Sequence, residues 1–518
     1  MADCKKRLNP VQSPDKVLNN FGQNRSWIIG SALLALFLGA LDALVMSAAM
    51  PTIIAELGGL HLYAWVYSAY FLARAVSLPV FGKLSDLFAT KNLFLFSIGL
   101  FVIASMAAGA SPSMGFLVAA RVFQGIGAGG IFALVYVVLS DVALPGQRAK
   151  TLSLASSVWG ISSLIGPTLG GFIVTWFSWR WIFYMNLPLG LVSLGGIALF
   201  FREFREKPGK IHLDWAGVGC LSGFILSLLT LVMMGGRELA WDSLQLILLA
   251  VLTLVLGVGF YLAEKHAKDP ILDFRFFKYP GFALGNIIAF CASFSIFALF
   301  AYAPLFLQGG LGRSPLEVGY AMLSLSLGWS MGSLFMGRVM HFVGQKRATL
   351  IGVVLMVAGC GFTLGFNSST TMTQCFLIFQ VVGLGMGFIT LSTLLIVQDC
   401  LKSRDLGVAT SFHQFSRTLG GTIGVGVCGG LVTARLMNQL EAANNLVPQE
   451  VMARLQESMS HLFQAEFQAL IPDETMYILR EAVVNGVYST FIIVSAVSLI
   501  SLFLAAFMPE KTSQKRMP

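Results

Sequence analysis

The segment WIIGSALLALFLGALDALVMSA (27–48) is an apolar run that contains one charged residue, Asp42. A bilayer core about 30 Å thick requires roughly 20 apolar residues of helix, so this run is long enough to span a membrane. Lipid offers the backbone no hydrogen-bond partner, so the run must be helical. It follows a polar segment and lacks a clear small-residue cleavage site, which favours a retained span over a signal peptide.

Similar runs continue along the whole chain of 518 residues, of which 56% are hydrophobic and 11% charged. Soluble domains average about 25% charged residues, so this chain cannot cover a water-facing surface of its size. A soluble enzyme, a nucleic-acid binder and a disordered scaffold are therefore excluded. We predict an all-α polytopic membrane protein with fourteen spans, at approximately 27–48, 62–82, 93–111, 115–140, 151–175, 180–201, 214–234, 243–263, 281–307, 316–337, 348–366, 374–397, 408–434 and 486–508.

The 34 lysines and arginines predict the orientation of these spans. Fourteen spans place both termini on one side, and that side receives 25 of the basic residues. The other side receives 6, and Arg74, Arg121 and Arg417 lie inside spans. The positive-inside rule makes the richer side cytoplasmic, so the net charge of +9 requires no nucleic-acid partner. The seven cysteines have no metal-binding spacing, and we interpret them as free thiols packed as small hydrophobes.

The chain also contains a weak internal repeat. GKLSDLFATK (82–91) matches GRVMHFVGQK (337–346) at an offset of 255 residues, and QGIGAGG (124–130) matches VGLGMGF (382–388) at an offset of 258. Duplicated halves around a central site are typical of secondary transporters. We expect these parts: a cytoplasmic segment (1–26), a six-helix bundle (27–201), a two-helix insert (214–263), a second six-helix bundle (281–508) and a cytoplasmic tail (509–518).

The second bundle includes a polar segment, 435–485, that we place outside the membrane. Apolar side chains recur in it at helical spacing, which favours a surface helix packed on the span ends. A cap over a substrate entrance is the alternative interpretation.

Four stretches resemble the Major Facilitator Superfamily, and specifically its fourteen-span branch of drug:proton antiporters. They are LDALVMSAAMPTI (41–53), GKLSDLFATK (82–91), RVFQGIGAGG (121–130) and GPTLGG (166–171). The resemblance implies the major facilitator fold and export by antiport. The chain departs from the family pattern at Ala89 and Thr90, where Gly-Arg is usual, and at Arg74, where a small or apolar residue is expected. His341 stands in the second repeat where Asp86 stands in the first.

Asp42, Arg121 and Arg74 are the candidates for proton coupling. They lie roughly 9, 8 and 15 Å from the outer ends of their spans, at 1.5 Å per residue, so they can reach one polar cluster. An ionised carboxylate is costly in lipid and must be paired, hydrated or protonated. The resemblance implies that Asp42 is the protonation site and Arg121 its partner. A static buried ion pair is the alternative.

The resemblance also implies a cytoplasmic gate and a seal. Asp86 is expected to cap the helix that starts near residues 406–410, because carboxylates are favoured at helix N-termini. The gate is extended by Gly82, Lys83, Lys91, Asp141 and Arg148, for which ordinary interfacial charge is the alternative. The seal is the antiporter motif of Gly166, Pro167, Gly170 and Gly171, for which generic tight packing is the alternative. Gly125, Gly127 and Gly129 are predicted to pack helices, since no strand precedes them as in a phosphate-binding loop.

Candidate residues for the substrate cavity are Gln124, Trp159, His413 and Arg417. One deep acid against three deep arginines suggests a substrate that is a neutral, zwitterionic or anionic amphiphile. The predicted function is therefore a proton-coupled antiporter that exports small hydrophobic or amphiphilic compounds from the inner (plasma) membrane. An uptake symporter and a non-transporting membrane sensor are the alternatives, and GPTLGG argues against the symporter.

No enzymatic constellation and no GxxxxGK[ST] loop occurs in the sequence, so neither an enzyme nor a self-contained ATP-driven pump is predicted. The expected partners are the small-molecule substrate, protons and the lipid bilayer, without nucleic acid, cofactor or metal. The sequence does not indicate whether a periplasmic partner is used.

Overall fold

The computed structural model describes residues 24–58, 62–144, 146–203, 214–235, 239, 242–267, 269–402, 405–442 and 472–509. Within these residues the regular structure is helical, apart from one isolated β-bridge between Gly235 and Leu239. The surface helix predicted within 435–485 falls mostly on residues 443–471, which lie outside the described part.

A long helix coincides with each of the fourteen predicted spans, so the predicted all-α membrane fold is confirmed. Eleven helices are long and apolar enough to cross a membrane. These are α2 (Arg25–Leu57), α4 (Thr90–Gly109), α5 (Met114–Asp141), α7 with α8 (Trp181–Tyr184, Asn186–Phe200), α9 (Trp215–Met234), α10 (Leu244–His266), α11 with η5 (Pro280–Leu305, Phe306–Gly310), α13 (Gln345–Thr363), α14 (Met372–Asp399), α15 (Leu406–Ala442) and α18 (Asp473–Ala506). The set is completed by α3 (Tyr63–Leu87), α6 (Arg148–Trp176) and α12 (Pro315–Val343), each 25 residues or longer.

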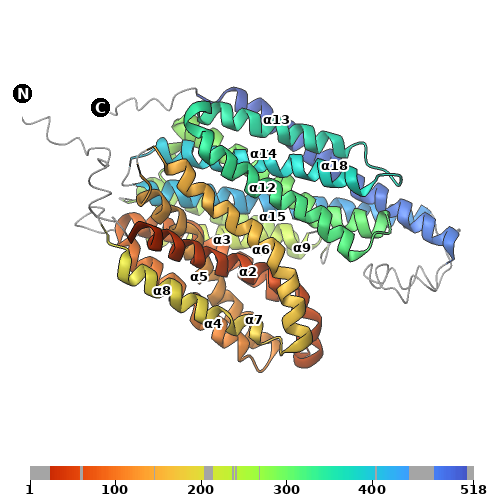
Figure 1. Ribbon diagram of the computed structural model, residues 1–518, viewed down its shortest axis with the longest axis horizontal. Coiled ribbons are helices and arrows are strands. Elements are labelled where there is room, and N and C mark those ends of the chain that lie inside the picture. Colours follow the sequence, from red (N-terminus) through yellow and green to blue (C-terminus); the bar gives the residue numbers. More distant parts are fainter. Residues whose placement is uncertain are drawn as a thin grey trace, which may run out of the picture. The chain divides into compact units, whose positions relative to one another are not determined.

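The described helices form two compact units (Figure 1). The first unit contains α2 to α8, the end of α12 (337–342) and the first turns of α15 (to residue 411). In it, α2 packs against α6 and α8, and α5 packs against α3 and α4. The second unit contains α9, α10 and the remaining helices, among which α11 and α13 both pack against α14 and α18. The separate two-helix insert stays a prediction.

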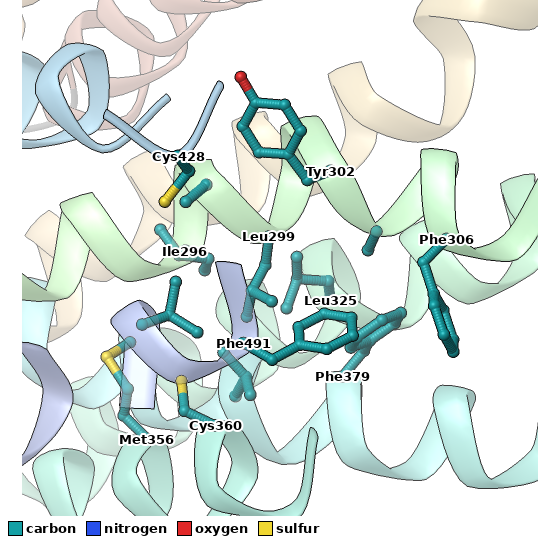
Figure 2. Packing of buried hydrophobic residues seen from close by; sticks show 14 of the residues in the cluster. Ile296, Leu299, Tyr302, Phe306, Leu325, Met356, Cys360, Phe379, Cys428 and Phe491 are labelled. Atoms are coloured by element: carbon teal, nitrogen blue, oxygen red, sulfur yellow. The ribbon is translucent and has the colours of Figure 1, made fainter. Parts of the chain in front are cut away.

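The second unit is held together by a large cluster of buried apolar side chains, part of which is shown in Figure 2. Phe306 stacks on Phe366 with ring centroids 5.4 Å apart, and Phe491 meets both rings edge-on. Cys360 and Cys428 are fully buried in the same cluster and are free thiols, as predicted for small hydrophobic packing residues.

Glycines on α5 allow its two neighbours to approach closely. A Cβ at Gly125 would lie 2.5 Å from the carbonyl oxygen of Tyr70, and one at Gly129 would lie 2.8 Å from that of Arg74, so both face α3. Gly127 faces α4 instead, where a Cβ would lie 2.7 Å from the backbone nitrogen of Phe101. The glycines of RVFQGIGAGG are therefore packing residues, which small side chains favour in membrane helices.

The same arrangement recurs on α14. Gly383 and Gly387 face α12 at the carbonyl groups of Leu325 and Trp329, and Gly385 faces α13 at that of Gly352. The two sets of glycines are 258 positions apart, and the contacted carbonyls of Arg74 and Trp329 are 255 positions apart. The internal repeat predicted from the sequence is therefore present as repeated helix packing, with Trp329 in the place of Arg74.

Because the atom that a Gly125 side chain would meet belongs to the backbone of α3, Gly125→Ala must push α3 and α5 apart. We expect a loss of about 1–3 kcal/mol, the usual cost of overpacking, measured as a lower thermal unfolding midpoint of the purified protein in detergent. Gly99→Ala on α4 is the matched control, since no atom lies within 4 Å of its added Cβ. Equal midpoints for the two variants would contradict this account of the glycine contacts.

Candidate functional site

The centre of the first unit is an ion pair between two fully buried side chains, Asp42 on α2 and Arg121 on α5. Arg121 Nη1 lies 2.5 Å from Asp42 Oδ2. Apolar side chains also lie beside the pair. Leu41 and Val45 flank Asp42 on α2, and each is 1% exposed. Burial makes both charges costly, so each depends on the other and on further hydrogen bonds.

Gln124 completes this pair and joins it to α4. Its Nε2 donates to Asp42 Oδ1 at 2.7 Å and to Ser105 Oγ at 2.8 Å, while its Oε1 accepts from Arg121 Nη1 at 2.7 Å. Asn186 at the start of α8 donates to the same Ser105 oxygen at 3.3 Å. Gln124 was predicted as a substrate-cavity residue, but both its amide hydrogens are used within this network.

Tyr70 and the backbone of α3 hold Arg121 from the other side. The guanidinium carbon of Arg121 lies 4.2 Å from the centre of the Tyr70 ring, and Arg121 Nε donates to the carbonyl oxygen of Val66 at 3.2 Å. The Tyr70 hydroxyl donates to the carbonyl oxygen of Gly39 on α2 at 3.1 Å. Sequence reasoning missed Tyr70, Ser105 and Asn186, although each is a polar side chain inside an apolar helix.

Arg74 was predicted to reach one polar cluster with Asp42 and Arg121, and it meets that cluster at the Tyr70 ring, whose centre lies 5.8 Å from its guanidinium carbon. It forms no ion pair with any described residue, and its guanidinium carbon lies 4.8 Å from the ring centre of Phe71 and 4.9 Å from that of Phe132. Phe132 in turn contacts Trp159 of α6, with ring centroids 5.6 Å apart. The helical count gave the depth of Arg74 in the membrane but not the face of α3 from which it projects.

Asp86 at the end of α3 caps the first turn of α15. Its two carboxylate oxygens accept hydrogen bonds from the backbone N–H groups of Gly407 and Val408, at 2.7 and 2.8 Å. These N–H groups have no partner within the helix, and the helix dipole favours a negative charge beside them. Gly82 permits the close approach, because an added Cβ would lie 2.9 Å from the carbonyl oxygen of Gly407 and would collide with Ser411.

The other predicted gate residues are not all at this contact. Lys91 Nζ donates to the carbonyl oxygen of Ala198 on α8 at 2.6 Å, and the Lys91 N–H donates to Glu203. Lys91 therefore ties α4 to the end of α8. Lys83 is half-buried on α3, Asp141 is the buried last residue of α5, and Arg148 is the first residue of α6.

The antiporter motif lies on α6, and one of its glycines meets α2 close to Asp42. A Cβ at Gly166 would lie 2.8 Å from Cβ of Leu44, whereas one at Gly171 would meet no atom within 4 Å. Gly170 is buried, and the side chain of Pro167 lies outside the described part of the chain. Gly166 thus differs from Gly171 in fixing the distance between α6 and α2.

A second polar cluster lies in the second unit, on α15. Arg417 Nη1 donates to Gln414 Oε1 at 2.8 Å, and the guanidinium carbon lies 5.1 Å from the ring centre of Trp329. His413 Nε2 lies 2.9 Å from the Thr393 hydroxyl, which itself donates to the carbonyl oxygen of Ile389. A hydroxyl has one hydrogen to donate, so His413 Nε2 donates to Thr393.

A charged contact beyond the apolar part of α2 was not foreseen. Glu56 accepts hydrogen bonds from Arg180 Nη1 at 2.5 Å and from Trp179 Nε1 at 2.7 Å, and Arg180 also lies over the Trp179 ring. These contacts join the end of α2 to the segment between α6 and α7. No group of three or more His, Cys, Asp and Glu side chains is placed to hold a metal ion within the described residues.

The comparisons with known proteins agree with this architecture. The profile of the Major Facilitator Superfamily matches residues 32–425. The chain is 34% identical over 426 residues to the multidrug transporter protein MdtP of Bacillus subtilis (strain 168), covering 82% of this chain and 78% of the relative. It is 29% identical over 484 residues to multidrug resistance protein 3 of the same strain, covering 93% of each. Efflux pump dotC of Dothistroma septosporum is 32% identical over 425 residues, 80% of this chain and 72% of the pump.

A solved structure, that of the human organic anion transporter MFSD10 (TETRAN), aligns with a TM-score of 0.63 and 14% identity, covering 93% of this chain and 99% of that one. At this identity the likeness shows the fold alone. The apolar helices and these matches together define a multi-pass membrane transporter rather than an enzyme. The chain belongs to the Major Facilitator Superfamily, whose members handle small-molecule substrates.

The Glu56 contact predicts a pH dependence of stability. The hydrogen bonds from Arg180 and Trp179 lower the pKa of the Glu56 carboxyl from its ordinary value of 4.5. The stabilisation is therefore present above pH 4.5 and is lost as pH falls through the lowered pKa. Wild type should have a higher unfolding midpoint than Glu56→Gln at pH 7, and the difference should shrink towards pH 4. A difference that is independent of pH would contradict the prediction.

Proposed function

We propose that the protein is a proton-coupled antiporter that exports small hydrophobic or amphiphilic compounds. The observation that carries this proposal is the hydrogen-bonding of Asp42, whose two carboxylate oxygens accept from Arg121 and Gln124 inside a membrane helix. The motif GPTLGG supports export as the direction of transport. The similar proteins, which are multidrug transporters and an efflux pump, support the same direction.

The Asp42 network allows a proton and two hydrogen-bond donors to compete for one carboxylate. A protonated carboxyl group carries its hydrogen on one oxygen and accepts fewer and weaker hydrogen bonds than a carboxylate does. Withdrawal of Arg121 or Gln124 therefore favours protonation of Asp42. A movement of α5 relative to α2 would in the same way expose the carboxylate for protonation, which couples the proton to a change of conformation.

The contact of Asp86 with the N-terminus of α15 is a second interaction that depends on the conformation of the protein. Its two charge-assisted hydrogen bonds stabilise one position of the α15 N-terminus against α3. We propose that this contact is the cytoplasmic gate, which is formed in one state of the transport cycle and broken in the other. We propose that the protein lies in the plasma membrane with both termini in the cytoplasm, because the basic residues favour that side.

The decisive variant for this proposal is Asp42→Asn in protein reconstituted into liposomes. An amide at this position cannot exchange a proton, so substrate-driven proton flux, followed with an internal pH dye, should fall to the level of protein-free liposomes. Exchange of labelled for unlabelled substrate without a gradient should persist, because it needs no protonation. Glu56→Gln is the matched acid-to-amide control and should keep wild-type flux.

Retained proton flux in Asp42→Asn would contradict the proposed coupling site. The direction of pumping is read in the same liposomes. Substrate that accumulates on the side from which protons leave supports antiport, whereas movement of both in one direction would identify the uptake symporter.

The contact of Gly166 on α6 with Leu44 on α2 makes a separate prediction about proton leak through the protein. Gly166→Ala must move Leu44 and thereby α2 beside Asp42, so we expect substrate-independent proton leak to rise severalfold in liposomes. Gly171→Ala, in the same motif but in open space, should leave the leak at the wild-type level. Equal leak in both variants would show that the motif has no such local role.

A further inference from the structure

Arg74 is a partly buried cation of the first unit that no described carboxylate neutralises. Its Nε and Nη1 are shielded from solvent and have no hydrogen-bond partner among the described residues. Arginine stays charged in proteins and carries five N–H donors. An intramembrane charge of this kind is expensive and is functional by default, so a static role would be expected to provide a carboxylate or carbonyl acceptor.

The surroundings of Arg74 are aromatic. Its guanidinium carbon lies within 6 Å of the ring centres of Phe71, Phe132 and Tyr70, at 4.8, 4.9 and 5.8 Å. The negative faces of such rings stabilise a cation without using its N–H donors. Trp159 extends the aromatic surface through its contact with Phe132. Arg74 also bonds to the Tyr70 hydroxyl. It therefore combines a stabilised positive charge, two nitrogens (Nε and Nη1) without a described partner, and an adjoining apolar surface.

The packing of α3 does not require the charge. In the second unit Trp329 occupies the repeat position of Arg74, and its backbone meets Gly387 as the backbone of Arg74 meets Gly129. Arg121, by contrast, has its charge matched by Asp42. Arg74 is thus an addition to a scaffold that is built equally well around an uncharged side chain.

We propose that Arg74 binds the anionic group of the transported compound, with Phe71, Phe132 and Trp159 contacting its apolar body. This assigns anionic amphiphiles with a planar hydrophobic body as the preferred substrate class, and it rests on the proposed export function. A guanidinium matches carboxylate and sulfonate oxygens well, and such bonds strengthen away from water.

The test uses three probes that share one pyrene body: pyrenebutyrate, which is anionic at pH 7, the neutral pyrenebutanol, and a pyrenebutyl trimethylammonium cation. Equilibrium binding to the purified full chain in detergent is followed by energy transfer from tryptophan to pyrene. Wild type should prefer the carboxylate over the alcohol and exclude the cation. Arg74→Leu should weaken carboxylate binding about tenfold or more, the scale of a lost charge-assisted contact, and change alcohol binding by less than about twofold. Arg74→Lys should restore part of the preference.

An unchanged carboxylate affinity in Arg74→Leu would overturn the proposal, because Arg74 would then not contact the anionic group. An equal loss of affinity for the carboxylate and the alcohol would also overturn it, because Arg74 would then have a structural role. Alcohol-driven proton flux in liposomes separates this proposal from the coupling mechanism. Arg74→Leu should retain that flux, since Asp42 is intact. Absence of flux in wild type with every probe would refute the coupling while leaving the binding result to decide the role of Arg74.

Discussion

The buried ion pair of Asp42 and Arg121 is the interaction on which the rest of the first unit depends. Neither charge can reach water, and removing one partner of a buried pair typically costs about 3–5 kcal/mol. The surrounding helices supply partners to both groups: α5 provides Gln124, α4 provides Ser105, and α3 provides Tyr70. The glycines of α5 make this possible, since they bring α3 and α4 close to α5. Both carboxylate oxygens of Asp42 are used, whereas Arg121 Nη2 has no partner among the described residues.

The two halves share their packing but not their chemistry. Glycines on α5 and α14 hold equivalent neighbours at equivalent distances, so duplication preserved the scaffold. The side chains at equivalent positions differ: Arg74 in the first half corresponds to Trp329 in the second, and the capping carboxylate of Asp86 corresponds to His341. The first half thus holds the deep acid and the carboxylate cap. The second half holds His413, which bonds to Thr393, and Arg417, which lies over the Trp329 ring. The two halves therefore carry different polar side chains on the same helical scaffold.

Much of the fold could be predicted from the sequence because lipid imposes a strict requirement on helix length and polarity. The fourteen spans follow from apolar runs, and the family resemblance predicted the pairing of Asp42 with Arg121. The helical count predicted that Arg74 reaches the same polar cluster. Arg74 meets that cluster at the Tyr70 ring and forms no ion pair with Asp42, because residue counting gives height along a helix and not the face from which a side chain projects. Gln124 illustrates a second limit. Its type suggested a ligand contact, whereas its amide serves the ion pair, a distinction that depends on three helices at once. The attachment of Lys91 to α8 likewise depends on tertiary packing that no local pattern encodes.

The central claim, that Asp42 exchanges its two donors for a proton as substrate binds and leaves, is tested most directly by proton release from the purified protein. Substrate is added to weakly buffered, detergent-solubilised protein, and the released protons are followed with a pH indicator dye. The account predicts that wild type releases protons when substrate is added and that Asp42→Asn releases none while still binding substrate. Equal release from the two proteins would contradict it, because the exchanging group would then be elsewhere in the chain.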